Sequence, residues 1–310
     1  CMNQIVLIFL ISFASKIAEG SISVFNLSLN LQSVPLSIIG VSYSIAAFPT
    51  LSRLFSSGQR DNFFSQIVSS SRHIIFWSIP VSVLFIVLRA QIVRTILGAG
   101  KFSWEDTRLT AAALALFTIS IVAQCMVLLF VRGYYAMGNT RKPLFVGLFS
   151  GAMIIFFSFI LLKAFNGIPI FRYFIESLLR VDNISGTAVL MLPLGYSLAT
   201  IANCILLGTY FNKDFPDFIK AVTKTLFQNF SASVIMGFVA YLSLNIFDNI
   251  FNLNTFIGIF SQGLLSGLIG ILSLILTLKL LKNKEVDEIW KTLHKKIWKA
   301  KPIAPDVSEL

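Results

Sequence analysis

The sequence has 310 residues, of which 56% are hydrophobic and 13% are charged, and its formal net charge is +11. A soluble globular domain carries about 25% charged residues, so this composition excludes an ordinary soluble domain. Apolar runs of about 20 residues recur, which is the length that crosses a bilayer as a helix, and the ~10-residue alternating segments of a transmembrane β-barrel are not seen. We therefore predict an all-α fold, a polytopic membrane helical bundle.

The positive net charge has two possible origins, binding to nucleic acid or orientation in a membrane. Lys and Arg collect in cytoplasmic loops and near anionic headgroups, so for so apolar a chain we expect contact with membrane lipids and no nucleic-acid partner. Cys125 and Cys204 lie inside apolar runs, and His73 and His294 stand far apart. Because no paired carboxylates, nucleophile–base set or metal-ligand cluster is apparent, we expect no enzyme, no cofactor and no metal site.

In chain order, the apolar runs predict about eight transmembrane helices. The first run is short and follows Cys1 almost at once, without the basic segment or cleavage site of a signal peptide, so we expect a fragment or a chain that lacks its first part. The predicted spans are 4–18, 21–51, 74–97, 107–131, 144–162, 187–211, 222–246 and 256–281.

Three connecting segments carry their own signals. The polar loop 52–66 contains Phe63 and Phe64, which suggest an interfacial turn. Ser103 and Asp106 have the spacing of a helix N-terminal capping box. The segment 171–179 is predicted to form an interfacial helix.

The C-terminal segment is strongly basic. Ile289, Leu293 and Ile297 recur at i, i+4 and i+8, with Trp290 and Trp298 beside them. This pattern is typical of an amphipathic helix in the headgroup layer, and a solvated helical extension is the alternative.

The distribution of Lys and Arg predicts the orientation of the chain. The loops that follow the second, fourth, sixth and eighth spans carry about twice as many of these residues as the other loops, largely because of the C-terminal segment. Cytoplasmic loops are enriched in Lys and Arg, so we expect the C-terminus in the cytoplasm. Arg53 and Arg132 are then candidate basic residues of the cytoplasmic face.

One face of the second span carries polar and small residues. Their spacing alternates between three and four, which keeps them on one side of a helix. The residues are Ser23, Asn26, Asn30, Ser33, Ser37, Gly40 and Ser44. They could be contacts between helices, or they could line a hydrated cavity that handles a polar headgroup. The two Asn amides favour the cavity, so we take Ser23, Asn26, Asn30, Ser33 and Ser37 as candidate cavity residues.

The same span contains a candidate hinge at Pro35 and Gly40. Proline removes one backbone hydrogen bond from a helix and permits a kink. Kinked or broken helices are typical of transporters that open and close around a binding site.

Four stretches, in order, resemble a known family. They read "GSISVFNLSLNLQSVPLSIIGVSYSIAAFPTLSRLFSSG", "LGAGKFSWEDTRLTAAAL", "VRGYYAMGNTRKPLFVG" and "GTAVLMLPLGYSLATIANCILL". Together they cover most of the chain and resemble the C-terminal half of the MurJ (MviN) lipid II flippase family, within the MOP exporter superfamily.

This resemblance implies a division of the chain and a set of partners. Its eight spans would be helices 7–14 of the family's fourteen. Residues 1–211 would form a transporter lobe, 212–281 two additional helices with a groove for a lipid tail, and 282–310 a basic cytoplasmic tail. The implied partners are an undecaprenyl-linked lipid, membrane lipids and an N-terminal lobe that is missing or separately encoded.

One position departs from the family pattern. The family has an Arg, thought to engage the diphosphate of the substrate, where this sequence has Asn30. An Asn donates hydrogen bonds but brings neither a charge nor a bidentate guanidinium.

The implied function is outward flipping of a lipid-linked peptidoglycan precursor across the cytoplasmic membrane by alternating access. A divergent exporter of another lipid-linked saccharide is a second possibility, and Asn30 favours it. A membrane protein of envelope assembly that does not transport is a third.

Overall fold

The computed structural model describes residues 2–98, 102–253, 255–281, 283 and 285–286, and this part of the chain is helical and contains no strand. The prediction of an all-α fold is therefore confirmed. In chain order the elements are α1 (Met2–Ala14), α2 (Ser21–Pro35), a π-helical turn η1 (Leu36–Val41), α3 (Ser42–Ser56), α4 (Arg60–Val87), α5 (Arg89–Leu97), α6 (Trp104–Thr118), α7 (Ile121–Ala136), α8 (Arg141–Gly167), α9 (Pro169–Leu179), a 3-10 turn η2 (Thr187–Leu190), α10 (Met191–Asp214), α11 (Phe218–Phe247) and α12 (Phe256–Leu280).

Among the described residues, six helical segments are long and apolar enough to cross a membrane, and α6 with α7 makes a seventh if that bent pair is one span. Helix α1 is apolar but shorter. Each predicted span thus overlaps a helix or a broken helix, and the count of about eight is consistent with the structure. The chain is a multi-pass membrane protein.

Helix α4 differs from the prediction at both ends. We expected a polar loop up to residue 66 and a span over 74–97, but the helix begins at Arg60 and ends at Val87, and α5 is separate. The segment is helical because Phe63 and Ile67 are fully buried in the bundle. Polar residues between them hid this apolar face from a reading based on hydropathy.

Two other local signals, the capping box and the helix near residue 171, are confirmed. The Ser103 side chain accepts a hydrogen bond from the backbone N–H of Asp106 at 3.0 Å, and the Asp106 carboxylate accepts one from the N–H of Ser103 at 2.9 Å. Helix α9 lies where the interfacial helix is predicted. The amphipathic helix predicted after residue 286 lies outside the described residues.

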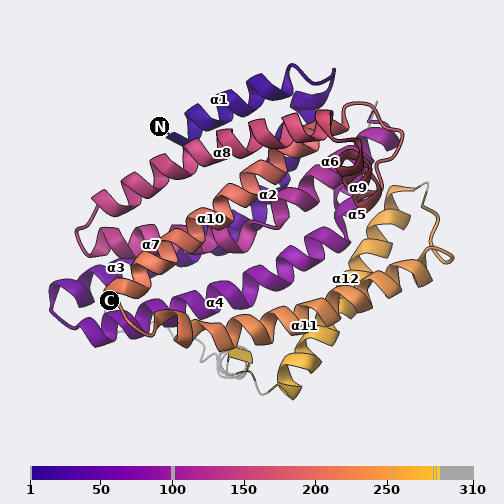
Figure 1. Cartoon of the computed structure of the whole chain (residues 1–310). Coiled ribbons are helices and arrows are strands. Elements are labelled where there is room, and N and C mark those ends of the chain that lie inside the picture. The colour runs from indigo at the N-terminus through magenta and orange to yellow at the C-terminus, as the bar shows by residue number, and fades with distance from the viewer. Residues whose placement is uncertain (1, 99–101, 254, 282, 284, 287–310) are drawn as a thin grey trace, which may run out of the picture.

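The bundle has two main apolar cores. One joins α1, α2, α6, α8 and α10, and the other joins α3, α4, α7 and α10. Helices α11 and α12 pack on each other as a hairpin and run along α4 and α5 (Figure 1). Helices α5, α6 and α9 lie at one end of the molecule, and the loops after α3 and α7 lie at the other end (Figure 1).

The close approach of α8 and α10 depends on Gly195. A Cβ atom added there would lie 2.7 Å from the Oγ atom and 2.9 Å from the Cα atom of Ser158, distances that real contacts do not show. Membrane helices approach closely through such small residues. We expect Gly195→Ala to lower the free energy of unfolding by about 1–3 kcal/mol, because the clash includes backbone.

Thermal unfolding of the purified protein in detergent measures this effect. Gly147→Ala is the matched control, because a Cβ atom on Gly147 of α8 would meet nothing within 4 Å. The control should keep or slightly raise the unfolding temperature, since alanine favours a helix over glycine. Equal unfolding temperatures for the two variants would contradict the packing described here.

Candidate functional site

Four of the five candidate cavity residues lie in α2 and the fifth, Ser37, lies in the turn η1, on the side that faces away from the bundle. The opposite side of this helix is buried against α6 and α1. Ser23, Asn30 and Ser37 are exposed, and Asn26 and Ser33 are half-buried. These five residues are called the polar face below. Gly40 and Ser44, which continue the same spacing along the sequence, are buried. The structure therefore brings only the first five residues of the series together at the surface.

The amides of the polar face have unused hydrogen-bonding capacity. The Ser33 hydroxyl donates to the backbone carbonyl of Asn30 at 2.7 Å and is satisfied within the helix. Among the described residues, no hydrogen bond involves the side-chain amide of Asn26 or Asn30. An unpaired amide in hydrocarbon costs several kcal/mol, so this face requires water or a polar partner.

The candidate hinge coincides with an irregular turn. Pro35 has no N–H, and directly after it the chain forms the π-helical turn η1 before the regular helix resumes at Ser42. Single π-turns inside helices are frequent at functional sites and cause kinks. At Gly40 the turn presses against α7, where an added Cβ would lie 2.9 Å from the Cys125 sulfur and 3.1 Å from its Cα.

Beneath the polar face, a buried polar network joins α2 to the break between α6 and α7. The Gln124 amide donates to the Gln32 side-chain oxygen at 3.1 Å and to the Ser120 hydroxyl oxygen at 2.9 Å. The Ser197 hydroxyl of α10 donates to the carbonyl of Leu116 at 2.7 Å. The helices bend by 42° here.

Sequence reasoning missed this network. Gln32 and Gln124 each interrupt an apolar run, and this interruption was the sequence signal for a buried polar contact. Their 92-residue separation hid their pairing.

The two basic residues predicted for the cytoplasmic face lie near the same end of the bundle. The Arg132 guanidinium of α7 stacks over the Phe48 ring of α3, with its carbon 5.6 Å from the ring centre. Arg53 is exposed in the last turn of α3. The packing of α3 on α7 fixes Arg132, whereas Arg53 extends from the surface.

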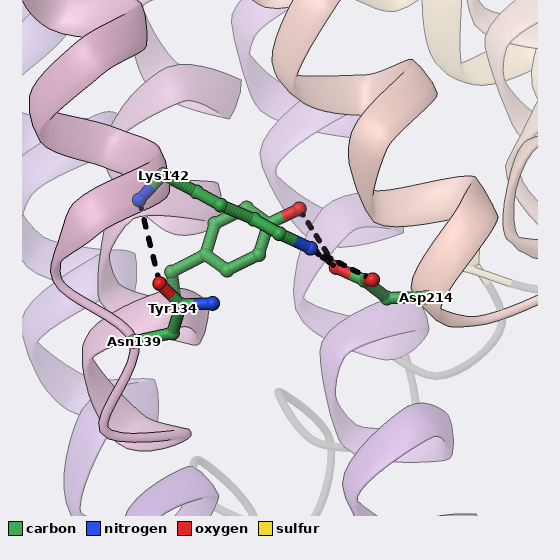
Figure 2. A network of polar contacts seen from close by, with 4 residues as sticks. All are labelled: Tyr134, Asn139, Lys142 and Asp214. Carbon is green, nitrogen blue, oxygen red and sulfur yellow. Dashed lines mark hydrogen bonds and ion pairs between the residues drawn. The ribbon is translucent and has the colours of Figure 1, made fainter.

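A second polar network links three helices near this end of the bundle (Figure 2). The Lys142 ammonium contacts the Asp214 carboxylate at 2.6 and 2.8 Å, and the Tyr134 hydroxyl donates to the same carboxylate at 3.1 Å. The Lys142 backbone N–H donates to the Asn139 side chain at 3.3 Å. These contacts join the ends of α7, α8 and α10, so the stretch "RGYYAMGNTRKP" here acts as a structural clamp.

Comparison with known proteins agrees with this architecture. The family model for the lipid II flippase MurJ matches residues 1–261. A probable lipid II flippase MurJ of Thermotoga maritima is 28% identical over 292 residues, which are 93% of this chain and 52% of that protein. One from Bdellovibrio bacteriovorus is 31% identical over 141 residues, or 46% of this chain and 27% of that protein.

A solved structure has the same fold. It is described as the lipid II flippase MurJ in an inward closed conformation, and it superposes with a TM-score of 0.67 at 22% identity over 92% of this chain and 52% of that chain. The chain spans about half the length of that solved flippase and about half the length of the Thermotoga relative. Because the family model matches most of its length, the chain belongs to the MurJ family.

Proposed function

We propose that the chain forms one lobe of a lipid II flippase, which moves an undecaprenyl-linked peptidoglycan precursor across the inner membrane. Membership of the MurJ family and the fold shared with a solved flippase support this proposal. The observation that carries it is the polar face of α2, whose amides are not buried and form no hydrogen bond with the described residues.

The polar face would form one wall of a hydrated cavity. Its residues point away from the helices of this lobe, so the opposite wall has to come from outside the described residues. A second, N-terminal lobe of the family fold would supply it. Asn26 and Asn30 would then donate hydrogen bonds to the polar headgroup, while the isoprenoid tail stays in the bilayer or against α11 and α12.

The hinge would let the cavity open to either side in turn. Pro35 and η1 divide the long segment Ser21–Ser56 into two helices, α2 and α3. A transporter needs two arrangements of similar free energy, and Pro35 already removes one backbone hydrogen bond from the helix at this point. Bending at this point would change the angle of the polar face without disturbing the core between α3 and α7.

The proposed orientation places the C-terminus in the cytoplasm. The excess of Lys and Arg in one set of loops supports it. Arg53 and Arg132 then lie on the cytoplasmic side, and α5 and α9 on the outer side.

Depletion of the chain in its own cells tests the function. We expect lipid II to accumulate in the inner leaflet and the cells to lyse. Lipid II that keeps its normal orientation after depletion would reject the flippase proposal and would leave an assembly role that does not involve transport.

A divergent exporter of another lipid-linked saccharide is the second candidate, and the observation that favours it is Asn30. A diphosphate is best bound by charged donors, and this position offers an uncharged amide. Accumulation of a different lipid-linked saccharide in the inner leaflet, with lipid II unchanged, would support this candidate over the first.

A further inference from the structure

A second polar site lies at the end of the molecule that carries α5 and α9, away from the polar face of α2. It is a pocket of about 660 Å³ lined by residues of α5 and α6, the C-terminal end of α9, and α11 and α12. These helix ends lie at the same end of the molecule (Figure 1). Its lining includes four arginines and one carboxylate, that of Asp248. The four are Arg89, Arg94, Arg108 and Arg180, and they define the arginine pocket.

The described carboxylates do not balance the positive charge of the arginine pocket. No ion pair among the described residues joins one of these arginines to a carboxylate. Asp248 instead accepts a hydrogen bond from the side-chain amide of Gln262. Since four guanidinium groups line one pocket with a single carboxylate, a bound anion would lower their mutual repulsion.

The arginines are positioned by contacts that leave most of their N–H donors available. Arg94 donates to the carbonyl of Phe102 at 3.1 Å and lies over the Trp104 ring. Arg108 donates to the carbonyl of Arg180. A guanidinium carries five N–H donors in a planar fork, so each of these groups still offers donors to a ligand.

Arg89 is the member of the set that the protein satisfies least. No hydrogen bond to its guanidinium is found among the described residues. Burial lowers the pKa of this group, and the positive charge of Arg180 lowers it further. Both effects are costs of holding the charge there, and the attraction of an anion bound between the arginines would offset them.

The surroundings of the pocket suit a lipid. Trp104 and Leu253 line it and are 58% and 41% exposed, and the half-buried Ile86 and Ile259 line it as well. Amphipathic aromatic side chains such as Trp gather at the depth of the headgroups, with apolar groups reaching into the acyl chains. A small soluble anion has no acyl chains, so it would not need these apolar side chains.

We propose that the arginine pocket binds the phosphate group of an anionic membrane phospholipid, whose acyl chains lie against the exposed apolar side chains at its rim. The bidentate guanidinium fork matches the geometry of a phosphate. The bound lipid would connect α5 and α6 to the hairpin of α11 and α12. This site does not depend on the nature of the transported cargo.

Native mass spectrometry of the full chain, extracted from vesicles of phosphatidylcholine with phosphatidylglycerol, tests the proposal. We expect the wild-type protein to retain phosphatidylglycerol in preference to phosphatidylcholine. Arg89→Gln should weaken this retention about tenfold or more, because it removes charge-assisted bonds to the phosphate. The matched control is Arg60→Gln, which removes an exposed arginine from the first turn of α4 and should leave retention unchanged.

Two outcomes would overturn the proposal. One is equal retention of phosphatidylglycerol by the wild type and Arg89→Gln. The other is stabilisation of the detergent-solubilised protein by inorganic phosphate to the same degree as by phosphatidylglycerol, which would point to a small-anion site. If Arg89→Gln fails to fold, a salt titration of the wild type takes its place: retention should weaken with ionic strength, and retention independent of salt would contradict the proposal.

Discussion

Gly40→Val is expected to abolish transport and to lower the free energy of unfolding by about 3 kcal/mol. An added Cβ would lie 2.9 Å from the Cys125 sulfur and 3.1 Å from the Cys125 Cα atom, and valine adds two further methyl groups. Overpacking of this kind in a buried contact costs about 1–3 kcal/mol, and here the neighbour includes the α7 backbone, which cannot rotate away. The π-turn would separate from α7. The hinge at Pro35 and Gly40 would then lose its packing against that helix.

The measurement pairs thermal unfolding in detergent with lipid II orientation in cells that carry the variant in place of the native chain. The control is Gly147→Val on α8, where a Cβ meets nothing within 4 Å. It should change stability by much less than Gly40→Val and leave transport intact. Normal transport by Gly40→Val would show that the η1–α7 contact is not needed for the cycle.

Asn30→Leu is expected to reduce transport about tenfold or more, with little change in stability. The residue is exposed and its amide has no partner among the described residues, so the fold loses no contact. A hydrogen bond to a charged group contributes about 1.5–3 kcal/mol, and about 1.4 kcal/mol corresponds to a factor of ten. The loss should therefore be seen in transport and not in the unfolding temperature.

Two variants complete this test. Val34→Leu changes an exposed residue on the same helix that lies outside the polar face, and it should transport normally. Asn30→Arg should keep or raise the transport of lipid II, because a guanidinium binds a diphosphate through charge-assisted bonds. It should harm an exporter of uncharged cargo. Full transport by Asn30→Leu would remove Asn30 from the site.

Hydropathy and helical spacing predicted the helices well, because both are local properties of the sequence. The capping box at Ser103 and the irregularity after Pro35 could be predicted for the same reason: each depends on residues within one or two turns. Helix α4 began earlier than predicted, because only the tertiary packing shows that Phe63 and Ile67 are buried.

The site was predicted less completely, because it depends on contacts between distant segments. The spacing of Ser and Asn predicted one side of α2, and the structure shows that this side is open from Ser23 to Ser37 and buried at Gly40. The bond between Gln32 and Gln124 and the gathering of four arginines in one pocket depend on the folded bundle. Local patterns mark the two Gln residues, but they show neither that the two side chains pair nor that the arginines meet.

The central claim is that water reaches the polar face of α2, and cysteine accessibility tests it most directly. A water-soluble maleimide added to membranes carrying Asn30→Cys measures contact with water, because the thiolate reacts only where it is hydrated. Ser28→Cys reports a fully buried position on the same helix, and Phe156→Cys an exposed position in the middle of α8, where lipid is expected. Reaction is scored above that of the parent protein, since the chain has its own cysteines. The account predicts fast labelling at position 30 and slow labelling at positions 28 and 156, and labelling at 30 as slow as at 156 would contradict it.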